Sequence, residues 1–277
     1  ADLFVIQHKI CQIRKNQMLL RRVIKHFQHQ EWTAIAIDFL IVVMGVFVGL
    51  QVSNWSAALN TDQQSVLFTE RLTADLQEEA FSTQFLVEYY EDITTHALKA
   101  LAMLENESTG SNEALLISAY RATQYTPAYR RRATYDELSA TGNLGLIRDE
   151  ALRMTAIRLY TAPHYKSFET EGENSRYRVA FRMAVPVAVQ NAVAQQCGDR
   201  ASTIGDYASI VDILDYECTT GLSADVLANA VIGLRSNETL VPLLRLRIMD
   251  IQTLISILSV SNPEILLGLK GLAKSDG

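Results

Sequence analysis

The residue types that commonly perform chemistry are present in this sequence, but their spacing matches no catalytic or metal-binding motif. None of the five histidines stands in an HExxH motif or in another paired carboxylate-histidine arrangement typical of a metal site. No GxSxG, Walker or Rossmann signature is present. We therefore expect no metal, no cofactor and no enzymatic activity. The histidines are His8, His26, His29, His96 and His164.

The charged clusters have ordinary explanations. Glu78-Glu79 and Glu91-Asp92 lie on a predicted helix, and solvated helix faces supply such carboxylates without forming an acid-base pair. The run Arg130-Arg131-Arg132, near Tyr125 and Tyr129, has the composition of a nucleic-acid contact. The acidic remainder of the chain favours instead a loop whose arginines are solvated or paired with acids, so we expect no nucleic-acid partner.

Cys197 and Cys218 are the only cysteines after the apolar stretch near the N-terminus. The intervening residues include the turn-forming pairs Gly198-Asp199 and Ile204-Gly205, which allow the chain to return on itself. In a compartment that permits disulfides we expect these cysteines to be bridged. Two buried free thiols are the alternative.

The apolar stretch itself, Ala34 to Val52, predicts a transmembrane helix. At about 1.5 Å per residue, a helix from Trp32 to Trp55 covers roughly the 30 Å of a bilayer core. These are the only two tryptophans in the chain. Because Trp prefers the headgroup level, one at each end indicates a pair of interfacial anchors.

The charge distribution predicts the orientation of this span. Residues 1–60 carry a net charge of +3 within a chain whose total is −6. Arg21, Arg22 and Lys25 lie shortly before the span, whereas the first basic residue after it is Arg71. The positive-inside bias therefore places residues 1–31 in the cytoplasm and residues 56–277 in the periplasm, with the span at residues 32–55.

The N-terminal segment leaves two questions open. Met18 is a candidate translation start, and an amphipathic helix follows it whose basic side suits an anionic membrane face or, alternatively, a packed partner. The small residues Ser56-Ala57-Ala58 resemble a signal-peptide cleavage site. The apolar stretch exceeds the usual length of a signal peptide's hydrophobic region, so we favour an uncleaved anchor.

One face of the predicted span has residues suited to helix association. Asp38, Gly45, Gly49 and Ser56 each lie within about 20° of one common direction at 100° per residue, so they share one face. The GxxxG spacing of Gly45 and Gly49 lets a second helix approach closely, and a carboxyl group on that face needs a partner away from lipid. We expect a protein partner or a second copy of the chain at this face, in addition to the lipid bilayer.

Composition and periodicity predict an all-α fold, in which the transmembrane helix is followed by a bundle of long helices. The 277 residues include only 13 Gly and 5 Pro, which disfavours a sandwich or barrel. A helical pattern without Gly or Pro runs from Asp62 to about Glu105, and Glu79 and Thr83 interrupt its apolar stripe, so we expect burial against the domain rather than a coiled coil. Further helices are expected over residues 164–195, kinked by Pro186, and from Glu238 to about Val260, capped by Asn237.

Residues 134–153 predict a helix, a turn and a second helix. Gly142 suits the left-handed position that closes the first helix, and Asp149 caps the next one. The turn motif comprises Gly142, Asn143 and Gly145. A phosphate-binding loop is a weaker interpretation, since no Gly-Lys-Ser/Thr sequence follows.

The apolar segment FLIVVMGVFVGLQVSNW (39–55), followed by a long helix and then by YDELSATGNLGLIRDEALR (135–153), resembles an uncharacterised family of bacterial single-pass membrane proteins. The resemblance extends over Met18 to Tyr160. It implies an inner-membrane location and an α-helical domain of no assigned function, and it implies no catalytic residue.

These observations favour a membrane-anchored structural or interaction protein, and a subunit of a larger membrane complex is one form that such a protein takes. One alternative is a periplasmic sensor acting through the transmembrane helix of a partner. Another is a hydrolase whose site has no recognisable motif; a deep pocket containing an acid or nucleophile with a shifted pKa would favour that alternative.

Overall fold

The computed structural model describes residues 32–127, 130–210, 213–260 and 263–273, and within them the protein is all-α. The predictions for residues 1–31, including the amphipathic helix after Met18, lie outside this range. By its internal contacts the chain divides into two units, residues 1–63 and 64–277, and each is considered separately below.

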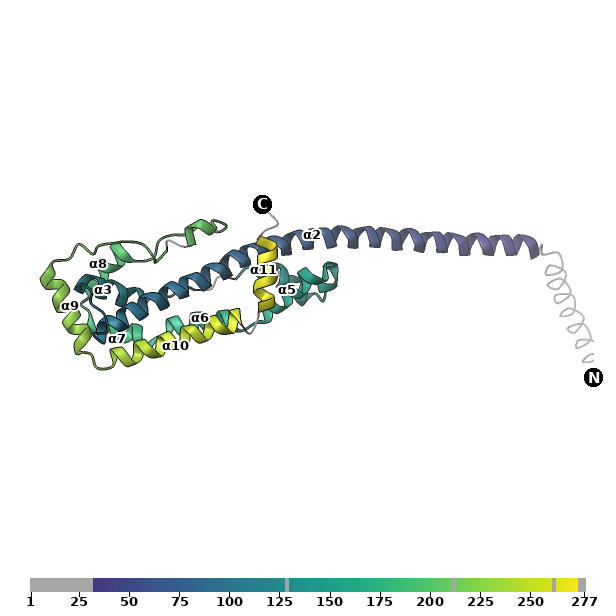
Figure 1. The fold of residues 1–277 in the computed structure, drawn as a ribbon. Coiled ribbons are helices and arrows are strands. Elements are labelled where there is room, and N and C mark those ends of the chain that lie inside the picture. Colours follow the sequence, from purple (N-terminus) through teal and green to yellow (C-terminus); the bar gives the residue numbers. More distant parts are fainter. Residues whose placement is uncertain (1–31, 128–129, 211–212, 261–262, 274–277) are drawn as a thin grey trace, which may run out of the picture. The chain divides into compact units, whose positions relative to one another are not determined.

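Helix α2 (Trp32–Leu104) is the longest element, with 73 residues (Figure 1). From Leu50 to Leu104 it contains neither Gly nor Pro, so no residue interrupts its backbone hydrogen bonds. The helix ends where Asn106 adopts a φ of 60° and the amide of Glu107 donates to the carbonyl of Ala102. The expected long helix and its end before the 106–112 segment are thus confirmed.

Shorter helices follow α2 and pack with its second half in the unit of residues 64–277. Contacts between neighbouring helices join α3 to α8 and α9, α10 to α6, α7 and α11, and α5 to α11. These elements are α3 (Asn112–Arg121), α4 (Ala133–Ala140), η1 (Leu144–Leu146), α5 (Glu150–Thr161), α6 (His164–Glu173), α7 (Arg176–Ala184), α8 (Val187–Cys197), η2 (Tyr207–Ile210), α9 (Ala224–Ser236), α10 (Leu240–Ser259) and α11 (Pro263–Ala273).

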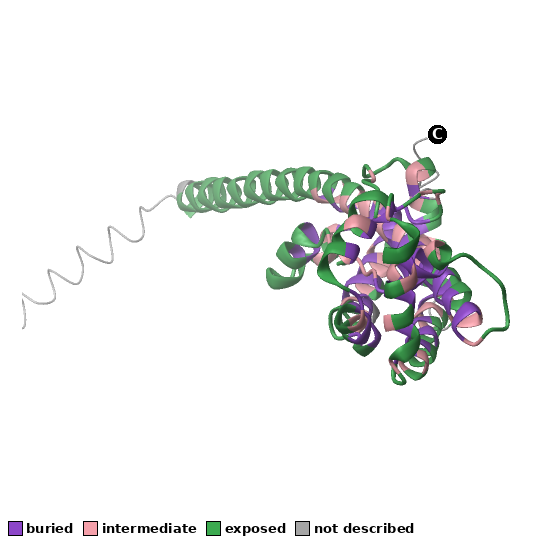
Figure 2. Cartoon of the chain, turned by 90° about the vertical axis from the view of Figure 1, so that its left-hand side faces the viewer, coloured by how far each residue is buried: buried purple, intermediate pink, exposed green. Residues whose placement is uncertain are grey.

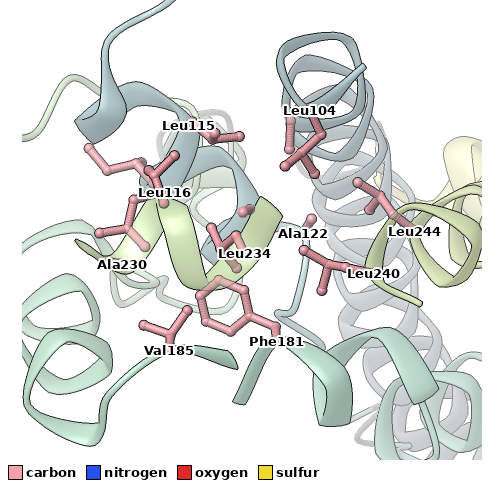
Figure 3. Close-up of a cluster of buried hydrophobic side chains, with 14 of the residues drawn as sticks. Leu104, Leu115, Leu116, Ala122, Phe181, Val185, Ala230, Leu234, Leu240 and Leu244 are labelled. Carbon is pink, nitrogen blue, oxygen red and sulfur yellow. The ribbon is translucent and has the colours of Figure 1, made fainter. Parts of the chain in front are cut away.

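Two apolar clusters form the core of this unit, and α2 contributes to both. Leu72 to Ile93 of α2 pack with side chains of α4, α5, α6 and α11. Ala97 to Leu104 pack with α3, α7, α8, α9 and α10. Figure 3 shows part of the second cluster, in which Leu104 of α2, Leu116 of α3 and Phe181 of α7 lie near side chains of α9 and α10. Burial of these side chains holds the shorter helices on α2.

The single kinked helix expected over residues 164–195 is wrong: the structure has three helices there. Ser175 is the N-cap residue of α7, because its hydroxyl accepts a hydrogen bond from the amide of Arg178. Helix α6 therefore ends before Ser175. Val185, which precedes Pro186, is extended, as the proline ring requires, and a new helix starts at Val187. A proline at a helix start is favourable, so Pro186 separates two helices instead of bending one.

The end of the chain also differs from expectation in detail. Helix α10 begins at Leu240 rather than at Glu238, and its N-cap residue is Thr239 instead of the expected Asn237. The side chain of Asn237 accepts hydrogen bonds from the amide and the hydroxyl of Thr239, so it stabilises the turn that precedes the helix. A further, shorter helix, α11, follows after Val260. Pro263 starts α11, again the position that proline favours.

Candidate functional site

The apolar stretch of α2 is exposed on every side of the helix. Of the residues from 32 to 64 whose side chains are described, all are exposed, including Phe39 at 69% and Leu40 at 63%. Figure 2 shows the same stretch in the colour of exposed residues throughout. By length and hydropathy this is a helix able to cross a membrane, and no other described helix meets the same criteria. Among the described residues of this unit, none covers these apolar side chains, and an exposed apolar surface of this extent is typical of a segment that contacts a membrane or a partner.

Within this stretch, the residues expected to receive another helix are open. A methyl group added at Gly45 or Gly49 would meet no atom within 4 Å. Asp38 is on the same face and is exposed. Trp32 and Trp55, near the two ends, are exposed to 70% and 67%. The face is therefore unoccupied within the described part of the chain.

The turn motif has a structural role. Gly142 has a φ of 70°, in the left-handed region that favours glycine, and the amide of Asn143 donates to the carbonyl of Leu138. Gly145 lies in η1 and is exposed. The side chain of Asp149 accepts from the amide of Leu152 and so caps α5. Ser65 of α2 donates its hydroxyl to the carbonyl of Leu146, which ties the turn to the long helix.

The arginine run pairs with acidic residues, most of them on α2. Arg130 donates through Nε to Glu79, 2.9 Å away, and Arg131 pairs with Glu78. Arg132 pairs with Asp136 within its own helical turn. This is the acid-paired loop that the sequence favoured over a nucleic-acid contact.

Glu79 lies at the wall of a cavity of about 380 Å³ between α2, the segment before α4 and α6. Burial raises the pKa of its carboxyl group, while Arg130 and the backbone amide of Arg131 oppose the rise. Both carboxylate oxygens accept hydrogen bonds, one from Arg130 and the other from the amide of Arg131. The guanidinium of Arg130 also lies 3.8 Å from the centre of the Tyr165 ring. Because both oxygens are engaged in holding the loop on α2, the geometry is that of a structural ion pair rather than a general base.

Cys197 and Cys218 are joined by a disulfide, with their Cα atoms 5.5 Å apart. This is the pairing expected from the sequence. It links the end of α8 to the segment before α9, where residues 198–223 contain little helix. The bridge therefore constrains the connection between α8 and α9.

Two buried arginines, Arg121 and Arg247, were not identified as important from the sequence. Arg247 is 2% exposed and lies 3.4 Å from Glu171. It occupies the apolar stripe of α10 beside Leu244 and Ile248, both buried. A charged residue on such a stripe was the available sequence signal, because arginine is almost never fully buried unless it is paired.

Within the residues that the structure describes, no three His, Cys, Asp or Glu side chains converge in a way that could hold an ion. The chain was compared with models of known protein families, with curated protein sequences and with solved structures, and nothing matches.

Proposed function

We propose that the protein is a single-pass membrane protein that acts by association, holding its helical domain against a partner at the bacterial inner membrane. The observation that carries the proposal is the exposure of apolar side chains around α2 before residue 60. Each Val, Leu, Ile or Phe side chain gains about 1.5–3 kcal/mol on leaving water. A charged residue at the centre of a membrane helix costs about 3 kcal/mol on insertion scales, so many apolar side chains outweigh the single Asp38.

The orientation follows from the charges on the two sides of the span. Arg21, Arg22 and Lys25 precede it, and the next basic residue is Arg71. The positive-inside rule therefore favours a cytoplasmic N-terminus and a periplasmic domain. The Cys197–Cys218 disulfide is consistent with such a compartment, because the periplasm is oxidising.

The open face of Gly45 and Gly49 is the surface proposed for association. Apolar lipid chains do not drive helices together, so close backbone contact and polar pairing provide the attraction. Glycines four residues apart permit that contact, and Asp38 on the same face gains from a partner's hydrogen-bond donor. The partner is a second copy of this helix or a transmembrane helix of another protein.

We expect the Gly45→Leu/Gly49→Leu double variant to lose its partner. The added side chains prevent close approach of a second helix while keeping the segment apolar enough to insert. The measurement is extraction in mild detergent followed by mass spectrometry and cross-linking of the full chain. Wild type should carry an accompanying protein or a second copy that the variant lacks.

The matched control is the Val43→Leu/Phe47→Leu variant, which changes the opposite side of the helix. It should retain the partner. A wild-type protein that remains an unaccompanied monomer, or a control that loses the partner equally, contradicts the proposed face.

A further inference from the structure

We propose that a pocket between α6, α7 and α10 binds a small zwitterionic molecule of the α-amino acid class. Helix α10 packs against both α6 and α7 (Figure 1). The pocket between them has a volume of about 120 Å³ and is lined by both charged and apolar residues. The proposal does not depend on how the protein associates in the membrane. The residues that carry the argument are Glu171, Arg176, Tyr177, Leu246, Arg247 and Asp250.

Arg247 and Glu171, at the wall of this pocket, have hydrogen-bonding capacity that the described part of the protein does not use. Nη1 of Arg247 lies 3.4 Å from Oε1 of Glu171, but it forms no hydrogen bond with any described atom. Nε of Arg247 and Oε2 of Glu171 are also buried without a hydrogen bond. These are three of the four buried side-chain nitrogen and oxygen atoms that lack a hydrogen bond in the described ranges. The unused capacity is therefore concentrated at this pocket.

Both residues gain from a molecule that completes their hydrogen bonds. A buried polar group without a partner is costly, because folding has removed the water that solvated it. Burial also raises the pKa of the Glu171 carboxyl group and lowers the pKa of the Arg247 guanidinium, and the charge of each residue opposes the shift of the other. Nη2 of Arg247 already donates to the carbonyl of Gln124, which leaves Nε and Nη1 as donors. The complementary molecule carries an acceptor for Arg247 and a donor for Glu171.

The charged residues that line the pocket balance one another. Glu171 and Arg247 form its buried wall, with side chains 11% and 1% exposed. Asp250 and Arg176 line it as well and are exposed, so the lining has two acidic and two basic residues. Arg178 also acts on Arg247, but it does not line the pocket. A ligand of one sign would leave the residues of that same sign unmatched, whereas a zwitterion matches both signs.

Size and spacing favour an α-amino acid over larger zwitterions. A protein cavity of about 150 Å³ holds a molecule of the size of benzene, so a pocket of about 120 Å³ suits glycine or alanine. In an α-amino acid the ammonium nitrogen and the carboxylate carbon are about 2.5 Å apart, because one carbon separates them. This short spacing suits Arg247 and Glu171, whose Nη1 and Oε1 atoms are 3.4 Å apart. Tyr177 and Leu246 supply apolar surface for the methyl group of alanine.

The test is calorimetric titration of the full chain in nonionic detergent with glycine and, separately, with L-alanine. We expect saturable binding of at least one of them at concentrations up to about 10 mM. Propionate lacks the ammonium group, ethylamine lacks the carboxylate, and γ-aminobutyrate holds the two charges farther apart. Each of these three should bind at least about tenfold more weakly than the better amino acid. The absence of binding for both amino acids overturns the proposal, and so does binding of propionate or ethylamine that is as tight as theirs.

Two exposed charges locate the site without disturbing the core. Asp250→Asn and Arg176→Gln should each weaken the binding of the amino acid about tenfold, because each removes one of the charges that match the zwitterion. The matched control is Arg245→Gln on α10, which removes an exposed charge that pairs with Glu105; neither residue lines the pocket. The control should bind as wild type does. Equal affinity for wild type, Asp250→Asn and Arg176→Gln overturns the assignment to this pocket.

A change of selectivity provides a result that misfolding cannot produce. Leu246→Ala widens the pocket at its apolar side. The ratio of the affinities for L-valine and for L-alanine should therefore rise several-fold in this variant, because the larger side chain gains room. An unchanged ratio contradicts the placement of the amino acid against Leu246.

Discussion

Replacement of Arg247 by alanine is expected to lower the free energy of unfolding by about 3–5 kcal/mol. The side chain of Arg247 is 1% exposed, and its Nη2 donates to the carbonyl of Gln124 at 2.6 Å. Its removal leaves the buried carboxylate of Glu171 without its cation and opens a cavity in the core. Urea unfolding of the full chain, followed by the near-ultraviolet circular dichroism of the buried tyrosines, measures the loss.

Arg245 on the same helix provides the matched control. It pairs with Glu105, but its side chain is 61% exposed, so Arg245→Ala should cost about 1 kcal/mol or less. Replacing both buried partners, in the variant Arg247→Met/Glu171→Leu, should recover much of the loss because no unpaired charge remains. Similar losses for Arg247→Ala and Arg245→Ala would contradict the role assigned to burial.

The second large effect is expected on removal of the disulfide. Closing the loop between Cys197 and Cys218 contributes about 3 kcal/mol by restricting the unfolded chain. The Cys197→Ala/Cys218→Ala variant should therefore unfold at correspondingly lower urea concentration. The variant also frees the segment that holds Arg121 in place. The loss in the free energy of unfolding should therefore be at least as large as the contribution of loop closure.

Thiol alkylation of the urea-unfolded native protein, with and without reductant, checks the bridge itself. Two additional cysteines should become reactive after reduction, while Cys11 reacts in both conditions. Unchanged alkylation would show that the native protein contains free thiols at these positions. In that event the alanine variant should lose little stability.

Helix α2 and the turn after α4 could be predicted because local rules determine them. The absence of Gly and Pro after Leu50 favours an uninterrupted helix, and the left-handed position at Gly142 requires a residue without a Cβ. The capping side chain of Asp149 is likewise set by residues next to it in sequence. None of these three features depends on contacts between residues that are distant in the sequence.

The breaks between α6, α7 and α8 were missed because helix ends depend on competing local and tertiary effects. Ser175 is compatible with a helix interior as well as with a cap, and the structure uses it as a cap. Pro186 likewise permits a kink or a new start. In the folded protein α7 packs against α9 and α10, and this packing favours the helix starts at Arg176 and Val187. The sequence alone does not show which helices pack together.

The charged residues that matter most within the folded unit could not be assigned from sequence spacing. Arg121 meets Cys197 and Tyr216 across separations of 76 and 95 residues. Arg247 reaches Gln124 across 123 residues. Such contacts exist only after the helices have packed, so the sequence could indicate at most that a charge lies on an apolar stripe.

Labelling of cysteines in intact cells with a membrane-impermeant thiol reagent tests directly whether α2 anchors a domain outside the cytoplasm. Cys11 precedes the span and serves as the native cytoplasmic reporter, and Thr109→Cys adds an exposed reporter after α2. We expect the Thr109→Cys variant to be labelled in intact cells at the introduced position, and Cys11 to be labelled only after the inner membrane is permeabilised. Labelling of Cys11 in intact cells, together with protection of the introduced cysteine, would contradict it.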